Sequence, residues 1–172
     1  MRLTRFFSFY IAAVIAGFVL LAGSERVMAA RPIGIDISDY QSPGVDWSVL
    51  KNTYGVTFGW AKISQGQRSS GGANFAGYAA SAKAAGVPIG AYHYSEINVD
   101  TGTAGATAEA NYFSTRAASY LVPGGYYLMP MLDVEGASLT GTKTSLSIWV
   151  NQWCTTVSNN SAALGNRVKP CL

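Results

Sequence analysis

Asp133 and Glu135 are separated by a single valine and follow the apolar run of residues 127–132. Side chains two apart on a strand point to the same face, so these carboxylates would project together with Cα atoms about 6.5 Å apart. Cleavage of a glycosidic bond uses such a pair, one acid to protonate the leaving oxygen and a second carboxylate on the anomeric side. Two nearby carboxylates also hold their pKa values apart, so that one can keep a proton near neutral pH. The spacing predicts a catalytic pair, with a metal site or a capped loop as the alternatives.

The chain around this pair alternates short apolar strands with helical segments, which is the pattern of βα units around a parallel sheet. The expected strands are 33–37, 57–63, 87–94 and 127–135, and the expected helices are 47–54, 75–85, 104–120 and 145–157. Residues 168–172 have the pattern of a fifth strand that is just beginning. We therefore predict an α/β fold, a TIM-like (β/α) barrel with about four and a half βα repeats, which is incomplete because a full barrel needs about 200 residues or more.

Several side chains are predicted to have structural roles in this scaffold. Asp46 and Asn74 directly precede the first two helices and are expected to be their N-caps. Trp149 and Trp153 lie four residues apart on one helix and are expected to face the core. His93 is the only histidine and lies between two tyrosines. We expect it to be a buried, hydrogen-bonded residue rather than a catalytic base.

Polar and aromatic residues stand at the carboxyl ends of all four expected strands, where barrels of this kind carry their function. The first strand ends in GIDIS followed by DYQ, the second in WAKISQG, the third in GAYHY and the fourth in LDVE. Aromatic faces pack on sugar rings, while acids and amides bind sugar hydroxyls. The strand ends therefore predict a cleft for a sugar.

The motifs GIDISDYQ, WAKISQG, GAYHY and LDVE resemble, in the same order, those of the family 25 glycoside hydrolases, secreted N-acetylmuramidases often called lysozymes. The resemblance covers residues 33–172. It implies a (β/α) barrel that hydrolyses the β-1,4 bond after N-acetylmuramic acid in peptidoglycan, with retention of configuration. The family's later strands are absent from this sequence, so the resemblance extends to an incomplete, truncated barrel.

Carried over residue by residue, the resemblance implies that Glu135 is the general acid and later the base, and that Asp133 is the second active-site carboxylate. Asp133 would either attack the anomeric carbon or orient the acetamido group of the substrate, and both alternatives stay open. Asp36 is implied as a third catalytic carboxylate, with capping of a turn as the alternative. The residues expected to line the sugar cleft are Tyr40, Lys62, Gln65, Tyr92 and Tyr94.

Two members of this cleft set have a second interpretation. Lys62 can be structural and pair with a carboxylate of the barrel instead of contacting the sugar. Gln65 stands where the family commonly carries a glutamate, so its amide can hydrogen-bond a sugar but cannot supply charge or accept a proton.

Residues 1–30 resemble a secretory signal peptide, because Arg2 and Arg5 precede an uncharged apolar segment, 6–22, and small residues follow at 27–30. The apolar segment is long, so an uncleaved N-terminal membrane anchor is the alternative. Cleavage after residue 30 would leave nine basic and eight acidic residues, without a basic stripe that would indicate nucleic acid binding. We expect the domain of residues 31–172 to be secreted or extracellular, at the cell envelope.

Export also decides how the two cysteines are interpreted. An oxidising compartment permits a disulfide between Cys154 and Cys171, which would stabilise the fold by about 3 kcal/mol in the chain-entropy model. Two cysteines and one histidine make no recognisable zinc site, so no metal or other cofactor is expected.

Two functions from different classes are compatible with the sequence. The first is a secreted muramidase that acts on peptidoglycan glycan strands and contributes to cell-wall catabolism. The second is a catalytically inactive, truncated remnant that only binds cell-wall glycan, because an incomplete barrel does not organise its acids. The sequence predicts no oligomeric state.

Overall fold

A computed structural model describes residues 31–41, 44–68, 71–122, 126–136, 139 and 141–172 of the 172-residue chain. The chain divides into two compact units, Met1–Arg31 and Pro32–Leu172, and every element given below belongs to the second. The predicted signal peptide or anchor, residues 1–30, lies outside the described residues. Within the described ranges, no helix is both long and apolar enough to cross a membrane.

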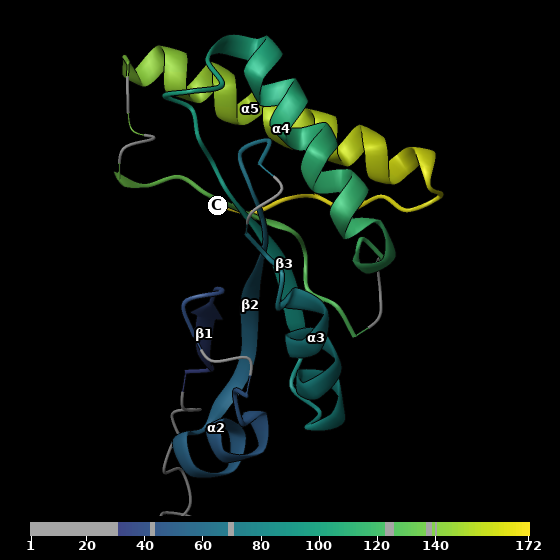
Figure 1. Ribbon diagram of the computed structural model, residues 1–172. Helices are drawn as coiled ribbons and strands as arrows, with labels where there is room; N and C mark the ends of the chain where they lie inside the picture. Colours follow the sequence, from purple (N-terminus) through teal and green to yellow (C-terminus); the bar gives the residue numbers. More distant parts are fainter. Residues whose placement is uncertain (1–30, 42–43, 69–70, 123–125, 137–138, 140) are drawn as a thin grey trace, which may run out of the picture. The chain divides into compact units, whose positions relative to one another are not determined.

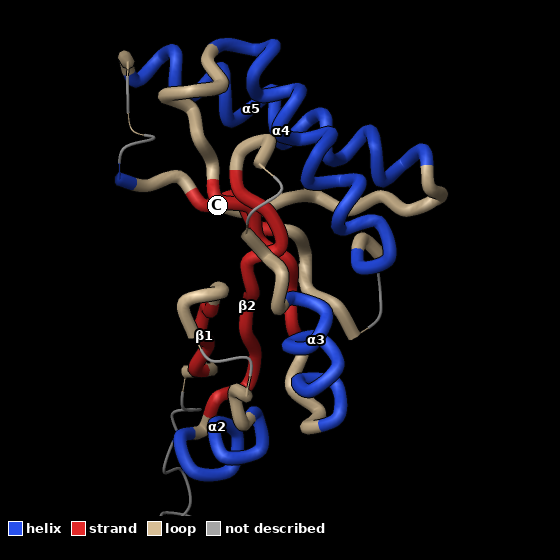
Figure 2. Tube along the Cα trace, viewed as in Figure 1, coloured by secondary structure: helices blue, strands red, loops and turns tan. Residues whose placement is uncertain are grey.

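Four parallel strands form one sheet in the order β1-β2-β3-β4, with helices in the connections (Figures 1 and 2). The elements are β1 (Ile33–Ile37), α2 (Trp47–Tyr54), β2 (Val56–Gln65), α3 (Phe75–Ala84), β3 (Ile89–Tyr94), α4 (Gly102–Ala117), the 3-10 helix η1 (Ala118–Tyr120), β4 (Met131–Asp133) and α5 (Lys143–Ala163). This arrangement confirms the predicted α/β fold with an incomplete (β/α) barrel.

Strand β4 is shorter than the predicted strand 127–135. Tyr127 forms only an isolated bridge with Ile89, and the regular ladder begins at Met131. Pro130 lies between them and has no N–H to donate to a neighbouring strand, which interrupts the pairing. On the far side of β4, Cys171 makes a parallel bridge with Met131. The predicted start of a fifth strand is therefore present as a single bridge.

The outer face of the sheet, which is covered by helices, holds the core. Trp149 and Trp153 of α5 are 1% and 0% exposed, as predicted, and Trp153 packs against Phe113 of α4. Helices α4 and α5 lie side by side along their lengths (Figure 1). Full burial of a large apolar side chain contributes about 1.5–3 kcal/mol. This helix pair therefore packs against β2 and β3.

The opposite, inner face of the sheet depends on two glycines for its shape. A Cβ atom at Gly34 would collide with the ring of Phe58, and one at Gly90 would collide with the indole of Trp60. The two rings lie 5.5 Å apart, edge to face, and the Trp60 Nε1 donates to Met129 O at 3.0 Å. Glycine is needed here because the rings occupy the space of the missing side chains. Phe58 and Trp60 therefore form an aromatic pair on the inner face of the sheet.

The loop that leads into α3 is held by a residue from another part of the chain. Asn74 occupies the N-cap position, as predicted, but its side chain makes no capping hydrogen bond. The carboxylate of Asp39 accepts instead from the N–H groups of Gly72, Ala73 and Asn74, at 2.6, 3.2 and 3.1 Å. Asp39 follows β1, so this contact ties the loop after β1 to the loop after β2.

Asp39→Ala is expected to lower the free energy of unfolding by about 2 kcal/mol, because three backbone N–H groups of the loop before α3 lose their charged acceptor. Urea-induced unfolding followed by circular dichroism measures this change. Asp46→Ala is the matched control, since Asp46 caps α2 through one hydrogen bond, from Val49 N at 2.9 Å. A loss of about 1 kcal/mol is expected there. An equal or smaller loss in Asp39→Ala would contradict a stabilising contact between Asp39 and the loop before α3.

Candidate active site

The register of the sheet brings most of the predicted site residues to its carboxyl edge. Tyr94 of β3 pairs with Gln65 of β2 on one side and with Asp133 of β4 on the other. One pair lower, Tyr92 is opposite Lys62. Because parallel strands end at the same edge, these side chains lie together although they come from three separate motifs.

A bulge in β2 determines which of its side chains face the inner side. The pairing with β3 shifts between Lys62 and Ser64, so that Ser64 is opposite His93 and Gln65 is opposite Tyr94. Such a bulge redirects the side chains that follow it. Lys62 and Gln65 consequently point to the same side, whereas Ser64 turns toward the helices and lies 2.7 Å from the ring of His93.

Three carboxylates act on one another at this edge. Burial, together with the negative charges of Glu135 and Asp36, raises the pKa of Asp133 to about 6 against the opposing positive charge of Lys62. Burial also raises the pKa of the Tyr92 hydroxyl, as do the charges of Asp133 and Asp36. Asp36, Asp133 and Glu135, predicted from two different motifs, thus share one electrostatic environment. A carboxyl group whose pKa is raised toward neutral pH can take part in acid–base catalysis.

Lys62 lies between the rings of Tyr40 and Tyr94 on the inner face of β2. Its ammonium is 5.5 Å from the ring centre of Tyr40 and 6.0 Å from that of Tyr94, and the residue is only 7% exposed. The ring of Tyr40 is 92% exposed, which leaves it available for stacking. Tyr92, at 6% exposed, has little surface to offer a sugar. Of the predicted tyrosines, Tyr40 and Tyr94 are therefore the better placed to contact a ligand.

Gln65 is held at both ends of its amide. Its Oε1 accepts from Lys62 Nζ at 3.2 Å, and its Nε2 donates to Glu96 Oε1 at 2.9 Å. Glu96 Oε2 in turn accepts from Arg68 Nε at 2.7 Å. We call Lys62, Gln65, Glu96 and Arg68 the rim row.

The sequence analysis missed Glu96 and Arg68. The position of Glu96, two residues after Tyr94 at the end of β3, was the available signal. Glu96 is 8% exposed and brings a carboxylate beside the amide of Gln65. Gln65, where the resemblance implies a glutamate, therefore lies next to Glu96, a carboxylate that follows the end of β3.

The predicted disulfide between Cys154 and Cys171 is not formed in this structure, in which both residues are free thiols. The Cys171 thiol donates to Pro130 O at 3.6 Å, and its backbone N–H donates to the same carbonyl at 2.9 Å. The side chain is therefore engaged with the strand neighbouring it. Burial raises the pKa of the Cys154 thiol, and the charge of the nearby Cys171 thiol raises it further.

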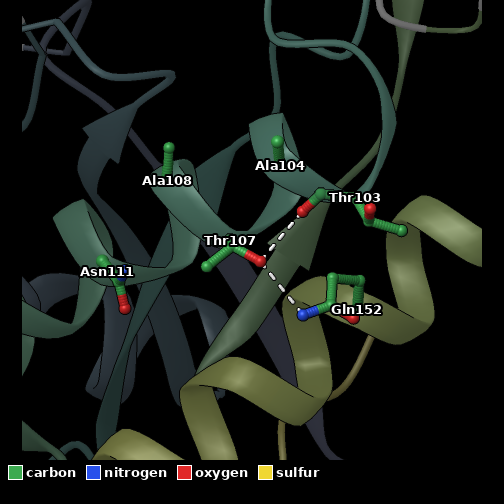
Figure 3. Close-up of a pocket in the computed structure, with 6 residues that line it drawn as sticks. All are labelled: Thr103, Ala104, Thr107, Ala108, Asn111 and Gln152. Atoms are coloured by element: carbon green, nitrogen blue, oxygen red, sulfur yellow. Dashed lines mark hydrogen bonds between the residues drawn. The ribbon is translucent and has the colours of Figure 1, made fainter.

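Two surface hollows differ in their chemistry. An open groove of about 480 Å³ between α4 and α5 is lined by Thr103, Ala104, Thr107, Ala108, Asn111 and Gln152 (Figure 3). These side chains are uncharged, and Thr107 bonds to Thr103 O and Gln152 Nε2, so the groove offers no acid or base. A second groove, of about 390 Å³, includes Asp133 together with apolar residues of β4 and α5. Only the second adjoins the carboxylates.

Comparison with known proteins agrees with this geometry. The family model described as glycosyl hydrolases family 25 matches residues 35–165. Lysozyme M1 of Streptomyces globisporus is 30% identical over 130 residues, which cover 70% of this chain and 40% of that protein.

Two solved structures have a similar fold. The muramidase of Acremonium alcalophilum matches with a TM-score of 0.62 and 24% identity over 75% of this chain and 61% of that one. The bacterial lysozyme of Streptomyces coelicolor matches with a TM-score of 0.61 and 26% identity over 74% of this chain and 57% of that one. This chain thus spans less than two thirds of each relative. Since the family match covers most of its residues, the chain belongs to glycosyl hydrolases family 25.

Proposed function

We propose that this chain is a secreted muramidase that hydrolyses the β-1,4 bond between N-acetylmuramic acid and N-acetylglucosamine in peptidoglycan. The observation that carries the proposal is the register of the sheet, in which Asp133 of β4 lies beside Tyr94 of β3 and Gln65 of β2 at one carboxyl edge, within reach of the charges of Glu135 and Asp36. Family membership and the muramidases and lysozymes among its relatives support the substrate class. Cell-wall catabolism outside the cytoplasm follows from that substrate.

The three carboxylates are assigned separate roles in this proposal. Glu135, which is exposed at the edge of the sheet, protonates the leaving oxygen and later activates water. Asp133 acts as an ionised carboxylate on the anomeric side, by direct attack or by orienting the acetamido group of the substrate. Asp36 adds negative charge to the same site and stabilises the positive charge that develops on the sugar ring.

The remaining cleft residues bind the glycan. The exposed ring of Tyr40 stacks on a sugar face, and the hydroxyl of Tyr94 lies beside the acids. Lys62 holds Gln65 and moderates the pKa of Asp133, so its role is electrostatic as well as structural. We propose no metal or cofactor for this reaction.

A glycan-binding protein without catalysis is the second candidate. It is favoured by the part of the chain that the structure describes, which holds four parallel strands with one further bridge at Cys171. In that arrangement the inner face, with Phe58 and Trp60 only partly covered, is open on one side. Such a face can stack on sugars without organising a reaction.

Incubation of the purified, folded chain with purified peptidoglycan distinguishes the two candidates. A muramidase releases new reducing ends that are N-acetylmuramic acid, which sugar analysis after borohydride reduction identifies. New ends that are N-acetylglucosamine would contradict the proposed bond. Sedimentation with peptidoglycan but no new ends, from a protein that circular dichroism shows to be folded, would establish the binding protein instead.

We also propose that export converts Cys154 and Cys171 into a disulfide that fastens the C-terminal segment to α5. The chain recovered from the medium is expected to contain no free thiol before reduction and two after it, as measured by thiol titration under denaturing conditions. Cys171→Ser is the control and is expected to show one free thiol throughout. Two free thiols in the exported chain before reduction would contradict the bridge.

A further inference from the structure

A buried chain of hydrogen bonds connects β2, β3 and α4 and has no part in the chemistry proposed above. Ser64 Oγ lies 2.7 Å from His93 Nδ1, and His93 Nε2 lies 2.7 Å from Glu109 Oε2 on α4. The carboxyl oxygens of Glu109 also accept the backbone N–H of Glu96, at 3.1 and 3.2 Å. Ser64, His93 and Glu109 are all 0% exposed, and we call them the buried relay.

The order of these groups is that of a nucleophilic serine with its base and acid, but their burial excludes that role. A nucleophile must reach the carbon it attacks, and Ser64 has no exposed surface. His93 is enclosed by Phe113 and by the ring of Trp153, which stacks on it at 5.6 Å. The relay therefore acts within the protein, not on a substrate.

Both ends of the buried relay meet the rim row. At one end, Ser64 occupies the bulge of β2 between Lys62 and Gln65. At the other end, Glu109 holds the backbone of Glu96, whose side chain binds Gln65 and Arg68. The cleft side of the sheet is thus connected to α4 at two points by hydrogen bonds that solvent does not reach.

We propose that Ser64, His93 and Glu109 are positioning residues that hold the rim row in its place at the cleft, with a neutral imidazole and a protonated Glu109. In this arrangement Glu109 Oε2–H donates to His93 Nε2, and His93 Nδ1–H donates to Ser64 Oγ. Glu109 Oε1 remains free to accept the Glu96 N–H. The inference deepens the proposed function and rests on it for the glycan that the rim row would bind.

Burial favours the neutral forms of both partners. It lowers the pKa of His93 to about 3, and it raises the pKa of Glu109 to about 9. The hydrogen bond from the Glu96 N–H opposes this rise of the Glu109 pKa, whereas a side-chain hydrogen bond with Asp100 and the charges of Asp100 and Glu96 add to it. An ion pair would place two charges where no water solvates them, which costs more than a neutral hydrogen bond.

The protonation state can be measured without any variant, because His93 is the only histidine of the chain. The imidazole nitrogens of the ¹⁵N-labelled wild-type protein are expected to give a neutral ring with the proton on Nδ1 at about pH 5, where an ordinary histidine is charged. An imidazolium at that pH, or a neutral ring protonated on Nε2, would overturn the proposed arrangement.

The positioning role is tested with Glu109→Gln and Glu109→Ala. The amide of the glutamine variant can still donate to His93 and accept from Glu96, so its rim row is expected to stay ordered. In Glu109→Ala, exchange with solvent of the Gln65 side-chain amide and the Arg68 Nε proton is expected to quicken by about tenfold. Binding to sedimented peptidoglycan is expected to weaken by a similar factor. Val157→Ala, in the core of α5 outside the relay, controls for lost stability.

The outcomes separate this inference from the proposed function. Faster exchange in Glu109→Ala alone, with Glu109→Gln and Val157→Ala like the wild type, supports the relay even where the wild-type chain does not bind peptidoglycan. A wild-type chain that does not bind peptidoglycan would count against the proposed function and not against the relay. Equal exchange in Glu109→Ala and Val157→Ala would overturn the positioning role. Faster exchange in Glu109→Gln would overturn the neutral pair of His93 and Glu109. If Glu109→Ala does not fold, Glu109→Gln still decides the test.

Discussion

Glu135→Gln is expected to abolish hydrolysis of peptidoglycan while the folded protein keeps its affinity for the glycan. The amide has the shape of the carboxyl group but cannot give a proton to the leaving oxygen. General acid–base catalysis contributes about 10²–10⁴ to the rate, so a loss of about a thousandfold in the release of reducing ends is expected. Binding is expected to stay within about threefold, because the neutral side chain preserves the contacts that do not depend on protonation.

The measurement pairs reducing-end release with sedimentation of the protein by purified peptidoglycan. Asp46→Asn is the matched control, since it also converts a carboxylate to an amide but does so at the N-cap of α2, where asparagine serves equally well. It is expected to retain full activity. Equal loss of binding and hydrolysis in Glu135→Gln, with unchanged circular dichroism, would show that Glu135 holds the substrate and is not the acid.

Local sequence signals predicted those parts of the fold that depend on neighbouring residues. Strand β1 and helix α2 have the predicted bounds, because Asp46 caps the helix from the adjacent position and Gly55 ends it at a φ of 71°. Strand β4 was overestimated because the apolar run continues through Pro130, and only the pairing with β3 and Cys171 shows where the ladder starts.

Contacts between distant residues could not be predicted in this way. Asp39 binds the loop before α3 from 33 to 35 residues away, and no local pattern in the sequence indicates that contact. The bulge in β2 depends on the register with β3, so the opposite directions of Ser64 and Gln65 could not be read from an alternating strand. His93 was predicted to be buried and hydrogen-bonded, which is confirmed, but its partner on α4 needed the packed structure.

The motif residues of the site were easier to find than their surroundings. Carboxyl groups at the ends of parallel strands share one edge of the sheet, so Asp36 and Asp133 could be placed together from the sequence. The motifs did not predict the burial and the neighbouring charges that determine the pKa of each carboxyl group. The effect of Lys62 on Asp133 depends on how the strands pair, and the contact of Gln65 with Glu96 depends on the loop after β3; the motifs specify neither.

Asp133→Asn is expected to give a more stable but inactive protein. The pKa of Asp133 in the folded state is about 6, raised by burial and by Glu135 and Asp36. The unfolded value is about 3.9, so the stability that this group contributes is fully present below about pH 4 and is lost as pH rises through about 6. The neutral amide avoids that loss. Allowing for the water that reaches a half-buried side chain, a gain of about 1 kcal/mol is expected near pH 7.

Urea unfolding at about pH 7 and about pH 4 measures this gain, which should shrink to a small fraction at the lower pH, because the wild-type carboxyl is protonated in the folded state there and about half protonated in the unfolded state. Asp46→Asn again serves as the control and should show no gain at either pH. A gain that persists at about pH 4 would mean that packing, not charge, is responsible.

The pH dependence of wild-type kcat/KM decides the role of Asp133 in the reaction, because that ratio reports ionisation of the free enzyme. With Asp133 acting as an ionised carboxylate, activity is expected to rise as pH increases through about 6, where the group loses its proton. Were Asp133 the general acid, activity would fall over the same interval, and Glu135 would have to supply the charge on the anomeric side. The stability gain in Asp133→Asn is expected in either case, because it depends on burial. The direction of the pH limb is therefore the observation that assigns the proton to one of the two acids.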